Sequence, residues 1–476
     1  MIIDRIKSNL FLYLSILLVL VLVITNIQNG FFWDTVQLGS KHANFYFTTN
    51  FNSLLLPEII DSGHIPAFGI YLALMWKIFG RTLVVSHLAM LPFVIGIIWQ
   101  LNITIKMFFE TKHSGFVLLL ILLDPTLLSQ ITLISPDVAL VFFFLFGLNS
   151  ILKNHRISLM LSIMLLFLIS MRGMMVSFCL LIADIFVNIN FKNSIKQIVH
   201  SLVKRSIIYL PALILFILFN MYHFSIKGWI GFHEDSPWAE SFARVNIKGF
   251  FRNIGILGWR LLDFGRVGIW LVFILLFLKY RKEIFKDKPT RLLLFILICF
   301  IVILPANMLW AKNLLGHRYL LPIFLMFSLL TARILYSINK NLKLKQILLS
   351  VWILVIVSGN FWIYPDKISQ GWDATLAHLP YYSLRKEAIS YFDEQKIEIN
   401  EVETFFPDSN IIDDIDLNND LRKFRRFEGG DGYVLYSNIH NVSDEIYDHL
   451  MGEYKLVKEF KSRGIFFKIL EKGSLN

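Results

Sequence analysis

Eleven apolar runs follow one another through the first 363 residues of this chain, and they constrain its fold more than any other feature. A transmembrane helix needs about 20 predominantly apolar residues, and the runs approach or reach that length. With 56% hydrophobic and only 17% charged residues, the chain has more apolar surface than a water-soluble core can bury. We therefore predict a multi-pass α-helical membrane protein. The runs cover residues 10–24, 82–105, 115–131, 138–152, 157–170, 173–189, 206–222, 266–278, 291–309, 318–337 and 344–363.

The distribution of positive charge predicts which ends of these runs face the cytoplasm. Short segments between alternate runs together carry 19 Lys and Arg residues, and the positive-inside rule assigns such segments to the cytoplasmic side. The apolar segment 66–80 is short and contains Lys77, and nearly all of these segments would face outward if it crossed. It is therefore predicted to lie at the interface, which leaves the N-terminus inside and the C-terminus outside. The basic residues are Arg5, Lys7, Lys106, Lys112, Lys153, Arg156, Lys192, Lys196, Lys204, Arg205, Lys279, Arg281, Lys282, Lys286, Lys288, Arg291, Lys340, Lys343 and Lys345.

The net charge of +11 is divided unevenly along the chain. Residues 1–365 carry +18 and residues 366–476 carry −7, so a basic membrane part is followed by an acidic tail. Cytoplasmic loops explain the basic excess, and no nucleic-acid partner is expected. The richness in Ile, Phe, Lys and Asn is typical of an AT-rich bacterial genome. The expected location is therefore the cytoplasmic (inner) membrane of a bacterium.

Two domains are predicted. Residues 1–363 form the transmembrane domain, with long outer loops at 28–81 and 223–264, and residues 364–476 form a small extracytoplasmic α/β domain. Long loops on one face are where binding and catalytic residues concentrate. The α/β prediction rests on helix-like segments at 384–395 and 444–451 and on strand-like segments at 402–406, 432–437, 454–460 and 464–470.

Two acidic residues of the outer face are candidates for catalysis. Asp34 follows an aromatic triplet just after the first run, where partial desolvation makes a carboxylate more basic and suits a general base. Asp137 lies on the next outer turn, directly after Pro136. Each could instead be an ordinary N-cap, Asp34 for a helix over 35–46 and Asp137 for the run that follows it.

Cationic side chains at the same face are candidates for binding a phosphate. Arg172 lies between two apolar runs with almost no loop, and His317 and Arg318 begin a late run. Arg and His side chains suit a phosphate or pyrophosphate headgroup, although each could also anchor a helix end at the interface. His64, close to Pro66, has the same two interpretations.

Three further residues are predicted to lie in a substrate cavity. Trp33 and Tyr319 are neighbours of Asp34 and Arg318 in the sequence. Asp124 falls within an apolar run, where a charge is costly and often functional. Alternatively, Asp124 is neutral and bonds to the backbone groups that Pro125 leaves free.

These features together resemble the GT-C superfamily of polyprenyl-phosphate-sugar-dependent glycosyltransferases, in particular the protein O-mannosyltransferases and the lipid A aminoarabinose transferases. The resemblance covers the whole membrane part and rests on the order and sidedness of several short motifs. The motifs are Trp33-Asp34 after the first run, His64-Ile65-Pro66 before the segment PAFGIYLALMWKIFG, Ser135-Pro136-Asp137 on the next outer turn, Arg172-Gly173 after the fifth run, and Arg318-Tyr319-Leu320-Leu321-Pro322 at a late run.

The resemblance implies an outer-face active site that a lipid-linked sugar donor reaches from the membrane. Asp34 then matches the catalytic acid of the first loop and Asp137 the second acidic position, while Arg172 and Arg318 match basic positions near the donor phosphate. The acceptor would be a lipid, a glycan or a protein, and a single displacement would invert the anomeric centre.

Two departures from the family pattern bear on metal and charge. Thr35 stands where many relatives have a second carboxylate, and Ile65 where relatives often have Lys. His64 or Arg172 could supply the missing cation. A divalent cation such as Mg²⁺ or Mn²⁺ stays open: Asp34 and Asp137 would be its ligands, but a metal site normally has more oxygen ligands than these two.

Other classes of function remain as alternatives at this stage. A secondary transporter or glycolipid flippase is the main one, although transporters usually show internal repeats and polar residues at mid-membrane. An O-antigen-type polymerase or ligase and a non-catalytic scaffold are further alternatives. A shared outer cavity for Asp34, Asp137, Arg172 and Arg318 would favour transfer, and a polar path through the bundle would favour transport.

Overall fold

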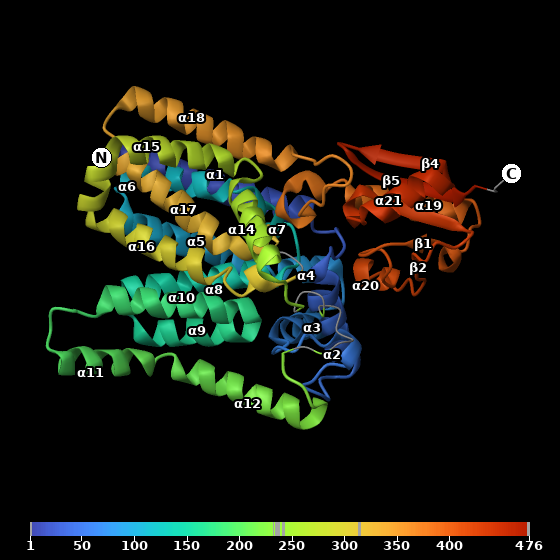
Figure 1. Ribbon diagram of the computed structural model, residues 1–476, viewed down its shortest axis with the longest axis horizontal. Helices are drawn as coiled ribbons and strands as arrows, with labels where there is room; N and C mark the ends of the chain where they lie inside the picture. Colours follow the sequence, from blue (N-terminus) through green and yellow to red (C-terminus); the bar gives the residue numbers. More distant parts are fainter. Residues whose placement is uncertain (1, 232, 234–238, 240–242, 313–315, 474–476) are drawn as a thin grey trace.

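The computed structural model describes residues 2–231, 233, 239, 243–312 and 316–473, and each of the eleven apolar runs coincides with a helix or a pair of helices. The helices lie side by side in a bundle (Figure 1). They are α1 (Ile2–Thr25), α4 (Leu83–Leu88) with α5 (Leu91–Phe108), α6 (Thr111–Leu122) with α7 (Pro125–Ile131), α8 (Pro136–Leu152), α9 (Arg156–Ile169), α10 (Met171–Asn188), α12 (Leu210–Lys227), α15 (Arg266–Lys286), α16 (Lys288–Ile303), α17 (Leu321–Arg333) and α18 (Leu342–Ser358).

Length and hydropathy identify fewer crossings than eleven. Among the described residues, six helical stretches are long and apolar enough to cross a membrane, or eight when two bent pairs count as one span each. The residues Asn9–Thr25 of α1, together with α8 and α9, are apolar but shorter. The helices and the fold indicate an integral membrane protein, and the number of crossings stays a prediction.

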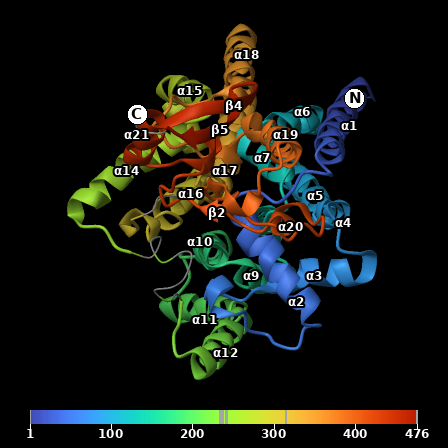
Figure 2. The same ribbon diagram turned by 90° about the vertical axis from the view of Figure 1, so that its right-hand side faces the viewer.

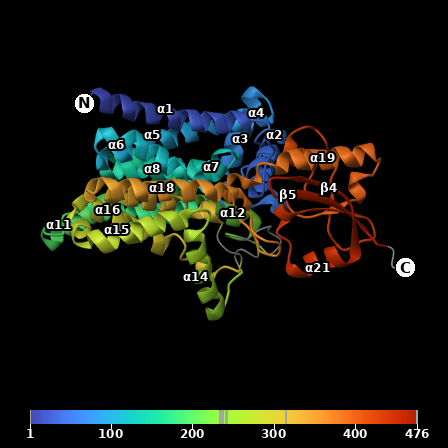
Figure 3. The same cartoon turned by 90° about the horizontal axis from the view of Figure 1, so that it is seen from above.

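The two bends have identifiable local causes. The α6–α7 pair turns by 76° where Asp124 caps α7 and Pro125 opens it, so the backbone of α6 cannot continue. The pair of α14 (Ile247–Leu262) and α15 turns by 88°. Gly265 at this second bend has φ +80°, and a Cβ there would lie 2.1 Å from the carbonyl oxygen of Val355. Only glycine fits this bend without strain. As a result α14, which begins within the predicted loop 223–264, stands out from the side of the bundle (Figure 3).

The predicted first outer loop, residues 28–81, forms short helices at one end of the bundle. They are η1 (Val36–Lys41), α2 (His42–Thr48), η2 (Glu58–Ile60) and α3 (Ala67–Phe79). Figure 1 shows α2 and α3 at the end that carries the C-terminal sheet, away from the opposite end, where α11 (Ile195–Ser206) lies. Figure 2, seen from the end with the sheet, shows α2 and α3 facing the viewer. That segment 66–80 lies at a membrane interface stays a prediction.

The C-terminal part contains the predicted mixture of helix and sheet. Five strands form one sheet in the order β2-β1-β3-β5-β4; β1 pairs in parallel with β2 and β3, and β5 pairs antiparallel with β3 and β4. Short 3₁₀ segments join the bundle to this region. The elements are η6 (Gly359–Phe361), η7 (Trp372–Ala374), η8 (Leu376–His378), α19 (Tyr381–Glu394), η9 (Ile399–Glu401), β1 (Glu403–Thr404), α20 (Ile412–Asp416), β2 (Arg425–Arg426), β3 (Tyr433–Ser437), η10 (Asn438–His440), α21 (Asp444–Glu453), β4 (Tyr454–Ser462) and β5 (Ile465–Lys472).

The core of this C-terminal region includes side chains from the membrane part. Phe32 and Leu133 are buried in the same apolar cluster as Tyr381 and Phe467. Polar contacts also join the two parts: Arg81 donates two hydrogen bonds to the carboxylate of Asp413, at 3.1 and 2.6 Å. The C-terminal region is therefore packed onto the first outer loop.

Candidate functional site

A cluster of ion pairs surrounds the guanidinium group of Arg318, at the end of the bundle next to the C-terminal region. Arg318 belongs to the 3₁₀ turn η4 (His317–Leu320), which leads into α17. Its Nε lies 3.0 Å from a carboxylate oxygen of Asp137, its Nη2 donates to Asp34, and its Nη1 donates to Asp373. Nη2 also lies 2.9 Å from the hydroxyl of Tyr319. One cation thus contacts three carboxylates from three separate parts of the chain.

Asp137 connects this arginine to a second one. Its carboxylate accepts from Nη1 of Arg172 and from Arg318, while the cap of α8 is the hydroxyl of Ser135. The Arg172 guanidinium lies 3.8 Å from the ring centroid of Tyr319. Ser170 caps α10 in the same way, which fixes Arg172 in the first turn of that helix. The N-cap alternative for Asp137 is thereby wrong, since another side chain makes the capping bond.

Asp34 is the most exposed carboxylate of the cluster. Its side chain is 28% exposed, against 4% for Asp137 and 6% for Asp373. The backbone before it is held in place because the Phe31 N–H donates to the carbonyl oxygen of Ile415 at 2.8 Å. Asp34 is therefore the acid that a ligand can reach, while the other two lie behind it.

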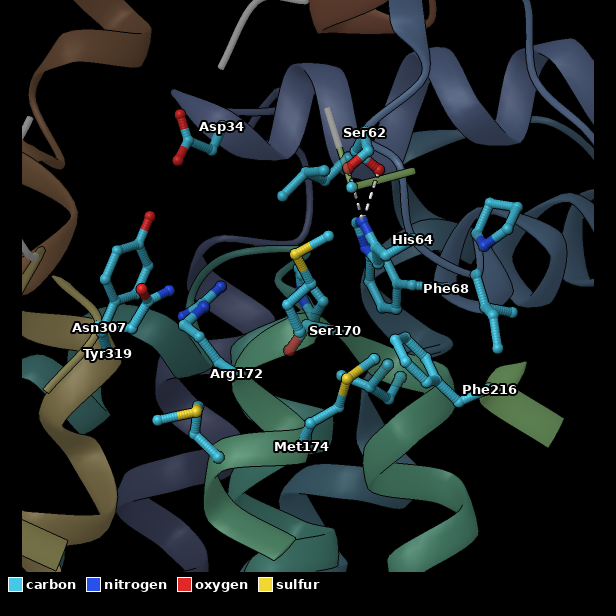
Figure 4. A pocket seen from close by; sticks show the side chains of 18 of the residues that line it. Asp34, Ser62, His64, Phe68, Ser170, Arg172, Met174, Phe216, Asn307 and Tyr319 are labelled. Atoms are coloured by element: carbon cyan, nitrogen blue, oxygen red, sulfur yellow. Dashed lines mark hydrogen bonds between the residues drawn. The ribbon is translucent and has the colours of Figure 1, made fainter. Parts of the chain in front are cut away.

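A cavity of about 440 Å³ opens beside Asp34. Asp34, His64, Arg172 and Tyr319 contribute to its wall, and Figure 4 shows Asp34 and Arg172 facing the same space from opposite sides. Among the carboxylates of the described residues, Asp34 alone lines this cavity. Much of the remaining wall is apolar, including Ile65, Phe68, Met171, Met174, Phe216 and Leu304.

Two histidines of the first outer loop line the cavity in their neutral form. Burial, together with the proximity of His64, lowers the pKa of His42 to about 3. Burial also lowers the pKa of His64, and the nearby Arg172 adds to this effect. The Nδ1 of His64 lies 2.6 Å from the hydroxyl of Ser62 (Figure 4). His64 is therefore a polar neutral group at pH 7, and Arg172 is a cation that faces Asp34 across the cavity.

Besides Asp137 and Arg318, the structure places three of the predicted site residues outside the cavity wall. His317 is fully buried, and its Nε2 lies 2.8 Å from Asp263. The ring of Trp33 packs edge-on against Phe406. These contacts give the two residues positions next to the site that do not face its open space.

Asp124 is the third predicted residue outside the wall. Its carboxylate accepts from the backbone N–H groups of Thr126 and Leu127 at 3.0 and 3.1 Å, so it caps α7. It also accepts from Arg266 at 2.7 and 2.9 Å. The sequence alternative, a neutral Asp124 bonded to backbone, is right about the backbone bonds but missed the arginine on α15 with which Asp124 forms a buried ion pair. The pair supports the α6–α7 bend and does not reach the cavity.

Sequence reasoning missed two charged residues of the site. Asp373 completes the contacts of Arg318, and Arg244 lines the cavity, donating to the carbonyl oxygen of Asn307 at 3.1 Å. Asp373 lies 55 positions from Arg318, and Arg244 lies in a long loop. The only available signal was the Trp372-Asp373 pair at the start of the C-terminal region.

The described residues do not fit a divalent metal ion. They contain no group of three or more His, Cys, Asp or Glu side chains placed to hold one. Asp34 and Asp137, the predicted ligands, both accept from Arg318, and Asp137 also accepts from Arg172. Guanidinium groups occupy the position beside these carboxylates that a cation would take.

The chain has a fold similar to the GT-C fold of ArnT. It is similar to the structure of ArnT from Cupriavidus metallidurans bound to undecaprenyl phosphate, with a TM-score of 0.52 and 11% sequence identity over 96% of this chain and 97% of that one. The apo structure of the same protein gives a TM-score of 0.51 and 10% identity, over 97% and 98% of the two chains. Neither the protein-family models nor the curated proteins give a match to the sequence. The resemblance noted in the sequence is thus confirmed at the level of the fold.

Proposed function

We propose that this protein is a membrane glycosyltransferase that moves a sugar from a polyprenyl-phosphate donor to an acceptor hydroxyl on the outer face of the membrane. The observation that carries the proposal is the cavity in which the Asp34 carboxylate and the Arg172 guanidinium face one space with an apolar wall. Transfer of a sugar from a lipid phosphate requires a base for the acceptor hydroxyl, a cation for the phosphate and apolar contacts for the lipid. The similar fold of a protein that was solved with bound undecaprenyl phosphate supports the same donor class.

The chemistry is a single displacement at the anomeric carbon. The oxygen of the acceptor hydroxyl attacks that carbon, and Asp34 accepts the proton of this hydroxyl. The bond between the anomeric carbon and the phosphate oxygen breaks, and the lipid phosphate leaves with the bonding electrons. Arg172 stabilises the charge that develops on this leaving group, which a guanidinium fork can do with two hydrogen bonds. One displacement inverts the configuration of the sugar.

Arg318 has a different position from Arg172. Its Nε, Nη1 and Nη2 groups each contact a carboxylate, and its side chain is 8% exposed. We assign it the task of holding Asp34 in place rather than binding the phosphate directly. His64, neutral and beside Ser62, is placed to accept or donate a hydrogen bond to the sugar.

The proposed topology follows from the same site. The bundle of residues 1–363 lies in the membrane, and residues 364–476 lie outside together with the first outer loop onto which they pack. The acceptor, whether lipid, glycan or protein, then approaches from the side of the C-terminal region.

The deciding experiment incubates the purified protein with a panel of polyprenyl-phosphate sugars and candidate acceptors, and measures released polyprenyl phosphate. We expect release with one donor and a loss of about 10²–10⁴-fold in Asp34→Asn, the usual effect of removing a general base. The variant should fold, because Asn keeps the shape of the side chain. A folded Asp34→Asn variant with normal turnover would remove Asp34 from the mechanism. Movement of an intact donor across proteoliposomes, without release, would establish transport instead.

A further inference from the structure

The third carboxylate on Arg318 comes from the C-terminal region. Asp373 lies in η7, a single 3₁₀ turn, and its carboxylate accepts from Nη1 of Arg318. Its side chain is 6% exposed and does not line the cavity. Asp373 therefore acts on the cavity only through the arginine that also contacts Asp34.

Hydrogen bonds to α7 fix the backbone of this turn. The carbonyl oxygen of Asp373 accepts from the Ser129 hydroxyl at 2.8 Å and from the Gln130 amide at 2.9 Å. The other end of the Gln130 amide accepts from the hydroxyl of Ser135, which caps the helix that carries Asp137. Two of the three carboxylates on Arg318 thus share one hydrogen-bonded frame.

The adjacent residue ties the same turn to the C-terminal core. Trp372 is buried in the apolar cluster of the C-terminal region, and its Nε1 lies 3.3 Å from the side-chain oxygen of Asn441. Two neighbouring residues of one turn therefore contact two different parts of the protein: Trp372 packs in the C-terminal core, and Asp373 contacts Arg318. The seating of the C-terminal region determines where Asp373 lies.

We propose that Asp373 is a positioning residue of the transfer site, through which the C-terminal region holds the Arg318 guanidinium in the orientation that Asp34 requires. This inference rests on the proposed function. The charged and titratable groups around the arginine are Asp34, Asp137, Asp373, Arg172 and Tyr319, so three carboxylates share two cations.

The first test is kinetic. Asp373→Asn removes the charge and keeps the shape, Asp373→Glu keeps the charge and moves it, and Asp366→Asn is the matched control. Asp366 lies on the same linking segment but is exposed and accepts from the Tyr447 hydroxyl. We expect Asp373→Asn to lower kcat about 10- to 100-fold, the scale of a misplaced catalytic group, while the donor KM changes by less than about twofold. Asp373→Glu should recover part of kcat, and Asp366→Asn should match the wild type.

The second test does not depend on turnover. A hydrophobic carbodiimide adds to carboxyl groups that it can reach, so the extent of Asp34 labelling at one pH, followed by mass spectrometry, reports how Asp34 is held. We expect this extent to change in Asp373→Asn, because the Arg318 guanidinium that contacts Asp34 loses one of its partners, and to stay near the wild-type value in Asp373→Glu and Asp366→Asn.

The outcomes separate the two proposals. A wild-type protein that releases no polyprenyl phosphate from any donor overturns the proposed function, and the change in labelling still decides the role of Asp373. An active wild type, with an Asp373→Asn variant that matches Asp366→Asn in kcat and in labelling, overturns the positioning role. If Asp373→Asn does not elute as a folded protein, Asp373→Glu decides alone, because an unchanged kcat there would contradict a positional requirement.

Discussion

At the scale of single residues, Arg172 carries the strongest prediction about the donor. It lines the cavity, faces Asp34 and packs over the ring of Tyr319 at 3.8 Å. Arg172→Ala should raise the donor KM at least tenfold and leave the acceptor KM within about twofold, since its fork binds the phosphate. Arg172→Lys should recover only part of the affinity, because a point charge replaces a fork that also stacks on an aromatic ring.

Donor titrations at fixed acceptor concentration, followed by release of polyprenyl phosphate, measure this effect. Arg252→Ala is a suitable control, since that arginine is exposed on α14 and lies outside the cavity wall. Equal donor KM values in Arg172→Ala and the wild type would return Arg172 to a structural role, that of partner to Asp137.

The sequence identified part of this residue cluster, and the reason for the omissions is physical. The sequence placed four of its residues at predicted outer helix ends: Asp34, Asp137, Arg172 and Arg318. Their predicted location on one face was enough to group them, and the structure brings them together. Sidedness says nothing about which carboxylates meet which arginine, and Asp373 comes from a turn whose place depends on tertiary packing. The neutrality of His64 also arises from burial, which the sequence does not report.

At the scale of elements, the join between α9 and α10 depends on Gly173. A Cβ at this position would lie 1.8 Å from the carbonyl oxygen of Leu166, so the last turn of α9 would have to move. Gly173→Ala should destabilise the protein by about 1–3 kcal/mol, the usual cost of overpacking, and displace the neighbouring Arg172. Thermal unfolding in detergent and the transfer assay measure the two effects.

Gly255→Ala provides the matched control for this substitution. Gly255 lies in the helical interior of α14, and a Cβ there has nothing within 4 Å. Alanine should stabilise that helix by about 0.5–1 kcal/mol, because glycine loses more conformational freedom on folding. If the Gly173→Ala variant has the same unfolding temperature as the wild type, the last turn of α9 can move without loss of stability.

Apolar periodicity located the elements well and their bends poorly. Each predicted run contains a helix, and the predicted segments of the C-terminal region correspond to α19, α21, β1, β3, β4 and β5. The two-residue strand β2 was missed, because it is held by its pairing with β1 and has no alternating pattern of its own. The α14 helix was missed within a long loop, since a half-polar helix that stands out from the bundle has no long apolar run.

At the scale of the whole molecule, the orientation in the membrane is the prediction with the widest consequences. Figures 1 and 3 place α11, which contains Lys196, Lys204 and Arg205, at the end of the bundle opposite the C-terminal sheet. The positive-inside rule then puts the sheet outside. Reporter fusions at Lys286 and at Asn400 should give cytoplasmic and exported signals, respectively. A cytoplasmic signal at Asn400 would contradict the model of an outer-face site.

The packing of Phe32 into the C-terminal core also has a consequence for how the protein is made and how it can evolve. This ring is fully buried, mostly among residues that follow it by more than three hundred positions. During synthesis the loop that contains Phe32 leaves the ribosome early, and its aromatic side chains stay exposed until the C-terminal region has been made. The hydrophobic core of the C-terminal region is likewise incomplete until this region packs onto that loop. The two parts are therefore not interchangeable modules: a tail exchanged between relatives would succeed only if the loop after the first helix were exchanged with it.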